Sequence, residues 1–330
     1  MTDIDLTPRD THPWVAVGED RLRFAVSIFP QPPDWQHFIG LVQRMEQLGY
    51  DGYFAYDHPT ANVDCWTSLA ALAASTNTIR LGTLVDCIYY RPPYLLARQA
   101  ADIDRLSGGR LVLGLGIGDL PSEFEQLGIP YPSTAERLST MEETIAIVRG
   151  LWSGEPFQFE GEYLRAGAAD SFLAPVQQPR VPILLAGGGE KVTLRQVAQY
   201  ADASNMGAHP SIGSAFTSEE ITRKFAKLDE YLAWFGRSPD SVLRSHFTMT
   251  LVLASDEKAL EQKMAWLAEV YGQEKLDWCG PALFPGTPAQ AIAFYEGLST
   301  LGFRYFIANI FEVDDETIEI LGTEVLPAFG

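Results

Sequence analysis

The sequence predicts an α/β protein that folds as one (β/α)8 barrel, a TIM barrel, with insertion segments. Three observations indicate this fold: eight short apolar runs, amphipathic segments between them, and no linker that would divide the chain into two domains. Apolar runs without strict alternation are typical of parallel strands that helices cover on the outside. The chain has 330 residues. A barrel of this kind takes roughly 250 residues, so about 80 remain for insertions.

The predicted strands are runs of three to eight residues, most of them rich in aliphatic and aromatic side chains. The run at 111–115 is too short for a helix and apolar on both faces, which favours a buried parallel strand. In chain order, the eight strands are expected at 22–29, 53–56, 79–85, 111–115, 183–186, 203–205, 247–253 and 305–310.

The predicted helices carry apolar residues at spacings of three and four, the repeat of an amphipathic helix. Leu138, Met141 and Ile145, for example, fall on one stripe. The helices are expected at 34–48, 64–75, 94–106, 134–152, 191–200, 218–235, 256–271, 288–301 and 314–325.

Several helix ends carry residues that suit them. Ser133 with Glu136, and Thr217 with Glu220, predict capping boxes, in which a hydroxyl and a carboxylate satisfy free backbone N–H groups. Gly49 ends the first helix, because glycine readily adopts the left-handed conformation found there.

The barrel domain is expected at 21–330, after a polar leader at 1–20. Two insertions are expected where periodicity fails, at 153–182 and at 272–286. Within the first, 157–164 alternates around a glycine and predicts a surface hairpin. The second is long enough to predict a lid over a pocket.

The composition excludes several classes of protein. Asp and Glu number 43 against 24 Lys and Arg, a formal charge of −19, so nucleic acid is not an expected partner. No apolar run approaches the roughly 20 residues that span a bilayer, and the start of the chain is polar and acidic, so we expect a soluble cytoplasmic protein. Neither the cysteines nor the histidines cluster, and we predict no metal; these residues are Cys65, Cys87, Cys279, His12, His37, His58, His209 and His246.

Three glycines crowd the end of the fourth predicted strand: Gly114, Gly116 and Gly118. Ligands of parallel barrels lie at the carboxyl ends of the strands, and glycine lets a flat or anionic ligand approach the backbone. The alternative is a tight exit from the strand that needs small residues. A dinucleotide-binding pair of domains is disfavoured, because the spacing is not GxGxxG. The acids Asp119 and Glu123 follow directly.

A second polar group ends the second predicted strand, where Asp57 precedes His58. Hydride transfer needs a proton donor near the substrate, and His58 suits this role if the carboxylate of Asp57 fixes its tautomer. The alternative is that Asp57 caps the following turn and His58 only packs in the site.

A third group follows the fifth predicted strand, where Gly187–Gly189 precede a helix. Free N–H groups and the helix dipole attract an anion there, with Lys191 beside them, so we predict a phosphate site; the alternative is a plain turn. Arg91 and Arg137 could reach an anionic group, or form structural ion pairs instead. Aromatic residues expected around the ligands are Phe29, Trp35, Tyr56, Tyr89, Tyr90 and Trp278.

Four motifs in this order resemble the bacterial luciferase-like monooxygenase family, and more narrowly its deazaflavin-dependent oxidoreductases. They are DHP at 57–59, SGGRLVLGLGIG at 107–118, ERLSTMEETIAIVRGLW at 136–152 and PILLAGGGEKVTLRQVAQYADASN at 182–205. The resemblance extends from about 22 to 325. It implies a (β/α)8 barrel that binds a flavin or deazaflavin at the strand exits, acts on a small-molecule substrate and is commonly a homodimer.

The resemblance also implies roles for individual residues. Asp57 and His58 would lie beside the reactive face of the cofactor ring, and Leu84-Val85 would back the ring, often through a non-proline cis peptide. Asp119 stands where some relatives have glutamate and is a third catalytic candidate. The implied cofactor-binding residues are Leu84, Val85, Gly116, Ile117, Gly118, Ser122, Gly187, Gly188, Gly189, Asn205 and Met206.

The function expected from this resemblance is hydride transfer between reduced deazaflavin, coenzyme F420, and a small organic substrate. Deazaflavin has carbon in place of the flavin nitrogen N5, which favours hydride chemistry over oxygen activation. The alternative is a monooxygenase that uses reduced FMN and oxygen. A second alternative is a flavin-binding protein without catalytic activity.

Overall fold

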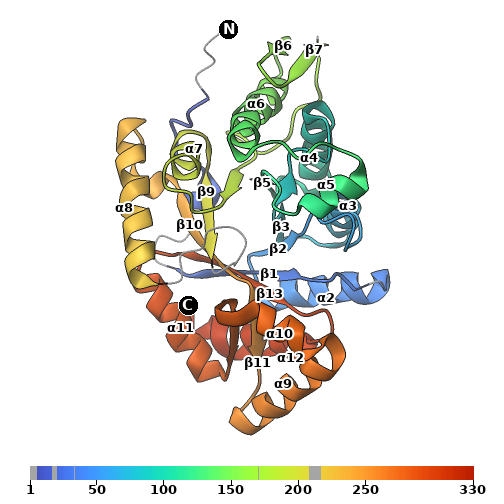
Figure 1. Ribbon diagram of the computed structural model, residues 1–330, viewed down its shortest axis with the longest axis vertical. Helices are drawn as coiled ribbons and strands as arrows, with labels where there is room; N and C mark the ends of the chain where they lie inside the picture. The colour runs from blue at the N-terminus through green and yellow to red at the C-terminus, as the bar shows by residue number, and fades with distance from the viewer. Residues whose placement is uncertain (1–5, 17–20, 33, 170, 208–216) are drawn as a thin grey trace.

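The computed structural model describes residues 6–16, 21–32, 34–169, 171–207 and 217–330, and within them it forms a closed barrel of eight parallel strands (Figure 1). The strand order is β3-β2-β1-β13-β10-β9-β8-β5, and pairing of β3 with β5 closes the ring. This confirms the predicted TIM barrel. The barrel strands are β1 Arg23–Ile28, β2 Gly52–Ala55, β3 Arg80–Thr83, β5 Leu111–Gly116, β8 Ile183–Ala186, β9 Ala203–Gly207, β10 Leu243–Thr248 and β13 Tyr305–Ile310.

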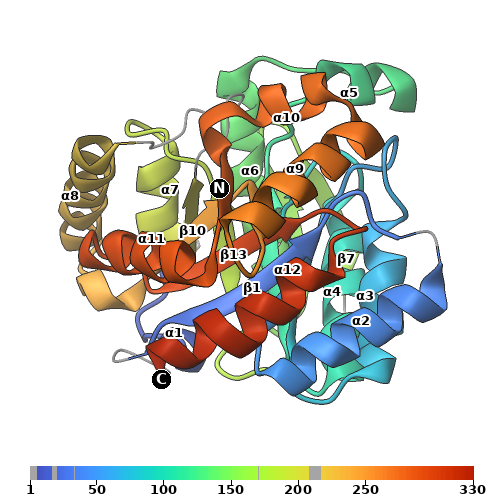
Figure 2. The same ribbon diagram turned by 90° about the horizontal axis from the view of Figure 1, so that it is seen from below.

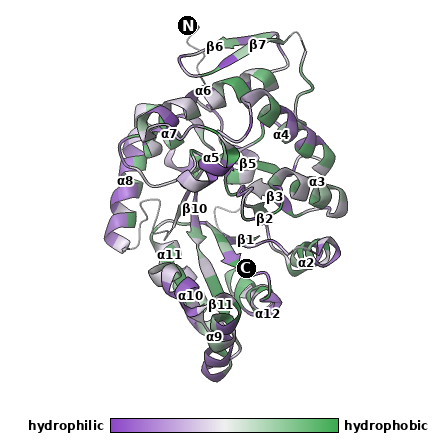
Figure 3. Ribbon diagram, turned by 45° about the vertical axis from the view of Figure 1, so that its right-hand side comes forward, coloured by the Kyte–Doolittle hydropathy of each residue, from purple (hydrophilic) through white to green (hydrophobic). Residues whose placement is uncertain are grey.

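Helices surround the barrel, with α2, α3 and α4 on one side and α7 and α8 on the opposite side (Figure 2). Their bounds are α2 Trp35–Leu48, α3 Cys65–Ser75, α4 Pro93–Ser107, α5 Pro121–Leu127, α6 Thr134–Trp152, α7 Thr193–Tyr200, α8 Ser218–Trp234, α9 Glu257–Tyr271, α10 Gln273–Cys279, α11 Pro288–Thr300 and α12 Asp315–Ile320. Figure 3 shows hydrophobic colour at β5 and mostly hydrophilic colour along α8, as expected for a buried strand and a surface helix.

The helix caps follow the sequence signals. The capping box of Thr217 and Glu220 is complete at the start of α8, and the Ser133 side chain accepts from the backbone N–H of Glu136 at the start of α6. Gly49 ends α2 with φ of 87°. The helices therefore begin and end close to where capping residues predict.

The segment expected as a polar leader closes one end of the barrel. Residues 1–5 and 17–20 of that segment lie outside the described residues, but α1 (Pro13–Ala16) places Trp14 fully buried beneath the strands. The Trp14 ring lies 5.4 Å from that of Tyr305 and below the guanidinium groups of Arg23 and Arg80, each 5.9 Å away. These partners begin β13, β1 and β3, so Trp14 fills the amino-terminal end of the barrel.

The seventh barrel strand lies earlier than predicted. The sequence favoured 247–253, whereas β10 spans Leu243–Thr248 and a separate strand, β11 (Thr250–Leu253), pairs outside the barrel with β12 (Leu283–Gly286). β10 contains Arg244, Ser245 and His246, so a search for apolar runs does not find it. Two of these residues are buried with partners: Ser245 accepts from Asn205, and His246 contacts Thr248.

Both predicted insertions contain more regular structure than expected. The hairpin pairs β6 (Phe157–Glu160) with β7 (Arg165–Ala169), so its second strand follows the predicted segment 157–164 and its turn lies within that segment. Figure 1 shows this hairpin beyond α6, away from the barrel. The predicted loop 272–286 consists of α10, a short 3-10 helix and β12.

None of the described helices is both long and apolar enough to cross a membrane.

Candidate active site

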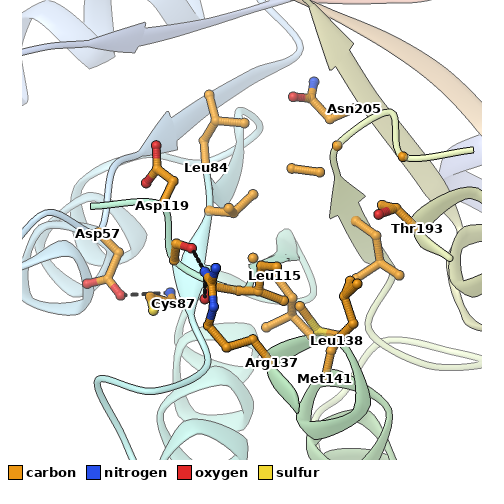
Figure 4. Close-up of a pocket in the computed structure, with 18 of the residues that line it drawn as sticks. Asp57, Leu84, Cys87, Leu115, Asp119, Arg137, Leu138, Met141, Thr193 and Asn205 are labelled. Atoms are coloured by element: carbon orange, nitrogen blue, oxygen red, sulfur yellow. Dashed lines mark hydrogen bonds between the residues drawn. The ribbon is translucent and has the colours of Figure 1, made fainter. Parts of the chain in front are cut away.

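A cavity of about 410 Å³ opens at the carboxyl ends of the barrel strands (Figure 4). Its walls come from the exits of β2, β3, β5, β8, β9 and β10 and from α6. Ligand cavities of parallel barrels lie at this end, where loops from several strands converge. The cavity is therefore the candidate active site.

The third barrel strand breaks where it meets the cavity. β3 ends at Thr83, the peptide between Leu84 and Val85 is cis, and β4 (Asp86–Cys87) resumes the pairing with β5. Leu84 and Val85 both line the cavity and form an apolar wall. The bend that the resemblance implied is therefore present at this position.

The glycines of β5 make room for this bend. A Cβ on Gly116 would lie 2.4 Å from a methyl carbon of Val85, and a Cβ on Gly114 would lie 2.0 Å from the carbonyl oxygen of Thr83. No side chain fits at either position without displacing the bend. Close packing between β5 and the bend thus explains these two glycines, while Gly116 also lines the cavity.

His58 and Glu123 form a hydrogen-bonded pair at one end of the cavity. Nδ1 of His58 lies 3.0 Å from Oε2 of Glu123. Tyr90 donates its hydroxyl to the same oxygen at 2.7 Å, and Thr60 donates to Oε1 at 2.9 Å. The Glu123 side chain is almost fully buried, whereas His58 lines the cavity. Glu123 thus holds the imidazole in place and leaves its second nitrogen, Nε2, for a ligand.

The charges of this pair reinforce each other. Burial lowers the pKa of His58, but the hydrogen bond that His58 donates to Glu123 and the charge of Glu123 outweigh burial, so the pKa is raised overall. Burial raises the pKa of Glu123, but hydrogen bonds from His58 and Tyr90 outweigh it, so that pKa is lowered. An ionised Glu123 accepts only, so Nδ1 of His58 carries a proton.

Asp57 has a different partner from the one expected. Its carboxylate binds Arg91 through two hydrogen bonds of 2.7 and 2.8 Å and accepts from the backbone N–H of Cys87 at 3.1 Å. Glu123, not Asp57, therefore orients His58. Asp119 lines the cavity, and its charge contributes to the raised pKa of His58.

The other end of the cavity carries the glycine loop before α7. Gly187 has φ of 115°, in the left-handed region, and its N–H donates to the carbonyl of Asn205 at 3.0 Å. Lys224 donates to the carbonyl of Gly188 at 2.5 Å and holds the loop from α8. The predicted neighbour Lys191 is exposed and does not line the cavity.

Arg137 is the cation of the cavity. It is buried, donates to the carbonyls of Ile117 and Gly118, and stacks over the ring of Tyr131 at 4.2 Å. Among the described residues, no carboxylate forms an ion pair with it. Arg137 thus brings an uncompensated positive charge to the cavity wall, while Arg91 is bound to carboxylates.

Most of the predicted site residues meet in this cavity. Those that line it are Tyr56, Asp57, His58, Leu84, Val85, Tyr90, Gly116, Ile117, Gly118, Asp119, Gly187, Gly188, Gly189 and Asn205. Figure 4 shows Asp57 and Asp119 on one side of the cavity and Asn205 and Thr193 on the other.

Several predicted site residues do not line it, among them Trp35, which is 36% exposed at the start of α2. Phe29 lies behind the wall, with its ring 5.2 Å from Tyr56 and 6.0 Å from His58. Tyr89 turns to α6, where it donates to Thr140 at 3.0 Å. Ser122 is exposed on α5, Met206 faces the core, and Trp278 lies on α10 with 48% of its surface exposed. Trp278, the residue expected to form a lid, therefore does not reach this cavity.

Sequence reasoning missed other lining residues and the role of Glu123. Leu138 and Met141 of α6 were assigned to a buried stripe by their spacing, whereas the amino-terminal turns of α6 and α7 line the cavity. Glu123 stands four residues after Asp119 at the exit of β5, which was the available signal. The missed lining residues are Cys87, Leu115, Tyr131, Thr134, Leu138, Met141, Leu185, Ala186, Thr193, Gln196 and Phe247.

Among the described residues, no group of three or more His, Cys, Asp or Glu side chains is arranged to hold a metal ion.

Comparison with known proteins agrees with this fold. The luciferase-like monooxygenase family matches residues 16–298, and the chain belongs to this family. It is 32% identical over 235 residues to an F420-dependent glucose-6-phosphate dehydrogenase of Kineococcus radiotolerans, a match that covers 68% of this chain and 66% of that protein. Matches to curated relatives cover between 49% and 66% of the relatives' length.

Solved structures show the same fold. The coenzyme F420-dependent tetrahydromethanopterin reductase of Methanopyrus kandleri superposes with a TM-score of 0.78 at 21% identity, over 94% of this chain and 100% of that one. A monooxygenase of Streptomyces bottropensis superposes with a TM-score of 0.77 at 22% identity, over 94% and 100%. These relatives include both F420-dependent enzymes and monooxygenases.

Proposed function

We propose that this protein is an F420-dependent oxidoreductase that transfers hydride between the coenzyme and a small, uncharged organic substrate. The observation that carries the proposal is the His58–Glu123 pair, a buried acid-base unit in the same cavity as the apolar bend at Leu84-Val85. The similarity of this chain to an F420-dependent glucose-6-phosphate dehydrogenase supports the choice of coenzyme.

The cavity fits a flat ring system with an anionic tail. Its volume of about 410 Å³ lies within the range of roughly 300–1,000 Å³ that small-molecule sites occupy. Leu84 and Val85 would back the ring. The glycine loop 187–189 and the unpaired cation Arg137 would bind the tail.

Each of the site residues has a distinct role in the proposed hydride transfer. Coenzyme F420, when bound, supplies or accepts the hydride at the carbon that replaces N5 of flavin. Protonated His58 can donate a proton from Nε2 to a substrate oxygen as negative charge develops there, and neutral His58 can accept it in the reverse direction. Glu123 stabilises the imidazolium and fixes its orientation. Tyr56 and Phe247 exclude water from this end of the cavity.

Charge at the His58 end supports an uncharged substrate. The residues outside the described part of the chain contain no Lys or Arg, so all 24 such residues are placed. Of these, Arg137 alone lines the cavity, and the acidic residues that line it are Asp57, which is bound to Arg91, and Asp119. An anionic substrate close to Asp119 would meet like charge. We therefore expect an alcohol or carbonyl compound without a phosphate or carboxylate.

Titration of the protein with coenzyme F420 and with FMN, followed by fluorescence, tests the coenzyme. We expect tighter binding of F420. Tighter binding of FMN, together with oxygen consumption by the reduced flavin, would favour the monooxygenase alternative. Binding of neither cofactor would contradict both, and binding without turnover of any substrate would favour the non-catalytic alternative.

The substrate class is tested on the F420-loaded protein. A panel of small secondary alcohols should reduce the coenzyme, whereas glucose 6-phosphate should not. Reduction by glucose 6-phosphate would show that the His58 end accepts an anion.

A further inference from the structure

A buried charge cluster lies directly behind the His58 end of the cavity. Nη1 of Arg91 lies 2.7 Å from Oδ2 of Asp57 and 2.7 Å from Oδ1 of Asp86. Asp86 has no exposed surface and Asp57 is 4% exposed. Asp64 also approaches Arg91, at 3.6 Å, but half of its side chain is in solvent. Two buried carboxyl groups therefore share one guanidinium.

This cluster has one negative charge too many if both carboxyl groups are ionised. Every Lys and Arg of the chain is placed, and Arg91 alone forms an ion pair with Asp57 or Asp86. An uncompensated charge in the interior is costly, and a buried acid takes up a proton rather than bear that cost. Two carboxyl groups close together commonly share one proton for the same reason.

The hydrogen bonds indicate which of the two carboxyl groups is neutral. Asp57 accepts from both guanidinium nitrogens of Arg91 and from the N–H of Cys87, which stabilises its ionised form. Asp86 accepts from Trp66 and Arg91 on Oδ1, while its Oδ2 is buried and accepts from no donor of the described residues. An ionised Asp86 would leave a charged oxygen unsatisfied.

We propose that Asp86 is a protonated carboxylic acid at neutral pH and that Asp86, Asp57 and Arg91 form a neutral unit that positions the cavity wall. Burial, and then the charge of Asp57, raise the pKa of Asp86 to about 8. The unit links three parts of the site: Asp57 precedes His58, Asp86 follows the bend at Leu84-Val85, and Cys87 begins the return to β5. Asp86 is thus a positioning residue, and the proposal does not depend on the choice of cofactor.

Infrared spectroscopy of the protein without cofactor tests this assignment. Ordinary Asp and Glu side chains are ionised at pH 7, because their pKa values lie near about 4. We expect one carboxylic acid C=O band at pH 7 that disappears as the pH rises through about 8. The isosteric variant Asp86→Asn should lack the band. The matched control Asp64→Asn, which removes the half-exposed carboxylate beside the same arginine, should retain it.

Unfolding at a series of pH values gives a second readout. Between the unfolded pKa of about 4 and the folded pKa of about 8, folded Asp86 holds a proton that the unfolded chain releases. Parent stability therefore falls with pH across this window. The ratio of the unfolding constants of the parent and Asp86→Asn should rise about tenfold per pH unit there and level off above it. The ratio of the unfolding constants of the parent and Asp64→Asn should stay constant across the same window.

Three results would overturn the proposal: no acid band in the parent at pH 7, a band that persists in Asp86→Asn, or a pH-independent ratio of unfolding constants. If Asp86→Asn does not fold, the parent band and its loss with rising pH still decide the assignment.

Discussion

Glu123 controls the titration of His58 through the hydrogen bond of 3.0 Å to Nδ1. Because this bond and the carboxylate charge outweigh burial and raise the pKa of His58, we expect Glu123→Gln to lower that pKa. NMR titration of the His58 ring measures the shift. Asp119→Asn is the control, since Asp119 acts only through its charge and should lower the pKa less. An unchanged pKa in Glu123→Gln would exclude the pair.

The same pair predicts how stability depends on pH. The folded pKa of His58 lies above the unfolded value of about 6.5. A raised pKa stabilises the fold fully below the unfolded value, and this contribution is lost as the pH rises through the folded pKa. Thermal unfolding at several pH values should show that loss in the parent and not in Glu123→Gln. Equal pH profiles of the two proteins would contradict the assignment.

His58 also has a predicted effect on the reaction itself. General acid-base catalysis contributes about 10² to 10⁴ in rate, so His58→Ala should slow hydride transfer by about that factor. Coenzyme binding should change much less, because His58 lies on the opposite side of the cavity from the glycine loop. Stopped-flow absorbance and fluorescence titration measure the two effects. Equal transfer rates in variant and parent would remove His58 from the mechanism.

The sequence pointed to Asp57 and His58 as site residues but not to their partners. Asp57 and His58 stood out because adjacent polar residues ended an apolar strand, and both do line the cavity. The partnership of Asp57 with Arg91 and of His58 with Glu123 depends on side-chain directions in three separate segments: the exit of β2, the turn before α4, and α5. Contacts between residues 34 and 65 positions apart cannot be read from local spacing.

At the scale of elements, the bend between β3 and β4 depends on the small residues of β5. An added methyl on Gly116 would lie 2.4 Å from Val85, so Gly116→Ala should destabilise the protein by about 1–3 kcal/mol and weaken cofactor binding. Urea unfolding and fluorescence titration measure both. Gly167→Ala is the matched control, because Gly167 is also in a strand but has open space around it. Similar losses in both variants would show that space at Gly116 is not limiting.

Strands were predictable from the sequence where apolar residues dominated them. The apolar strands β1, β5 and β13 follow their sequence runs closely, because both faces are buried. β10 did not, because its buried Ser245 and His246 are polar and satisfied by other strands or side chains. The predicted third strand, 79–85, ran on through a bend that periodicity alone does not reveal.

At the scale of the whole molecule, the two ends of the barrel serve different purposes. The carboxyl end carries the cavity, with its charged and glycine-rich loops. The amino end is filled by Trp14, Tyr305 and the two stacked arginines Arg23 and Arg80. Different residues therefore stabilise the fold and line the candidate site, as is usual in barrels of this kind. The alternation of strands and helices predicted the ring, but not this packing beneath it.

Trp14 tests this separation of roles. Its side chain is fully buried, so Trp14→Ala should lower the free energy of unfolding by about 3–5 kcal/mol. The folded variant should still bind the cofactor with nearly unchanged affinity, because Trp14 lies at the opposite end of the strands from the cavity. Trp234→Ala is the control: that tryptophan is 73% exposed and should change stability by about 0.5 kcal/mol or less. Urea unfolding and fluorescence titration of the three proteins measure these effects. Loss of cofactor binding in folded Trp14→Ala would show that the two ends are coupled, because packing below the strands would then determine the shape of the cavity above them.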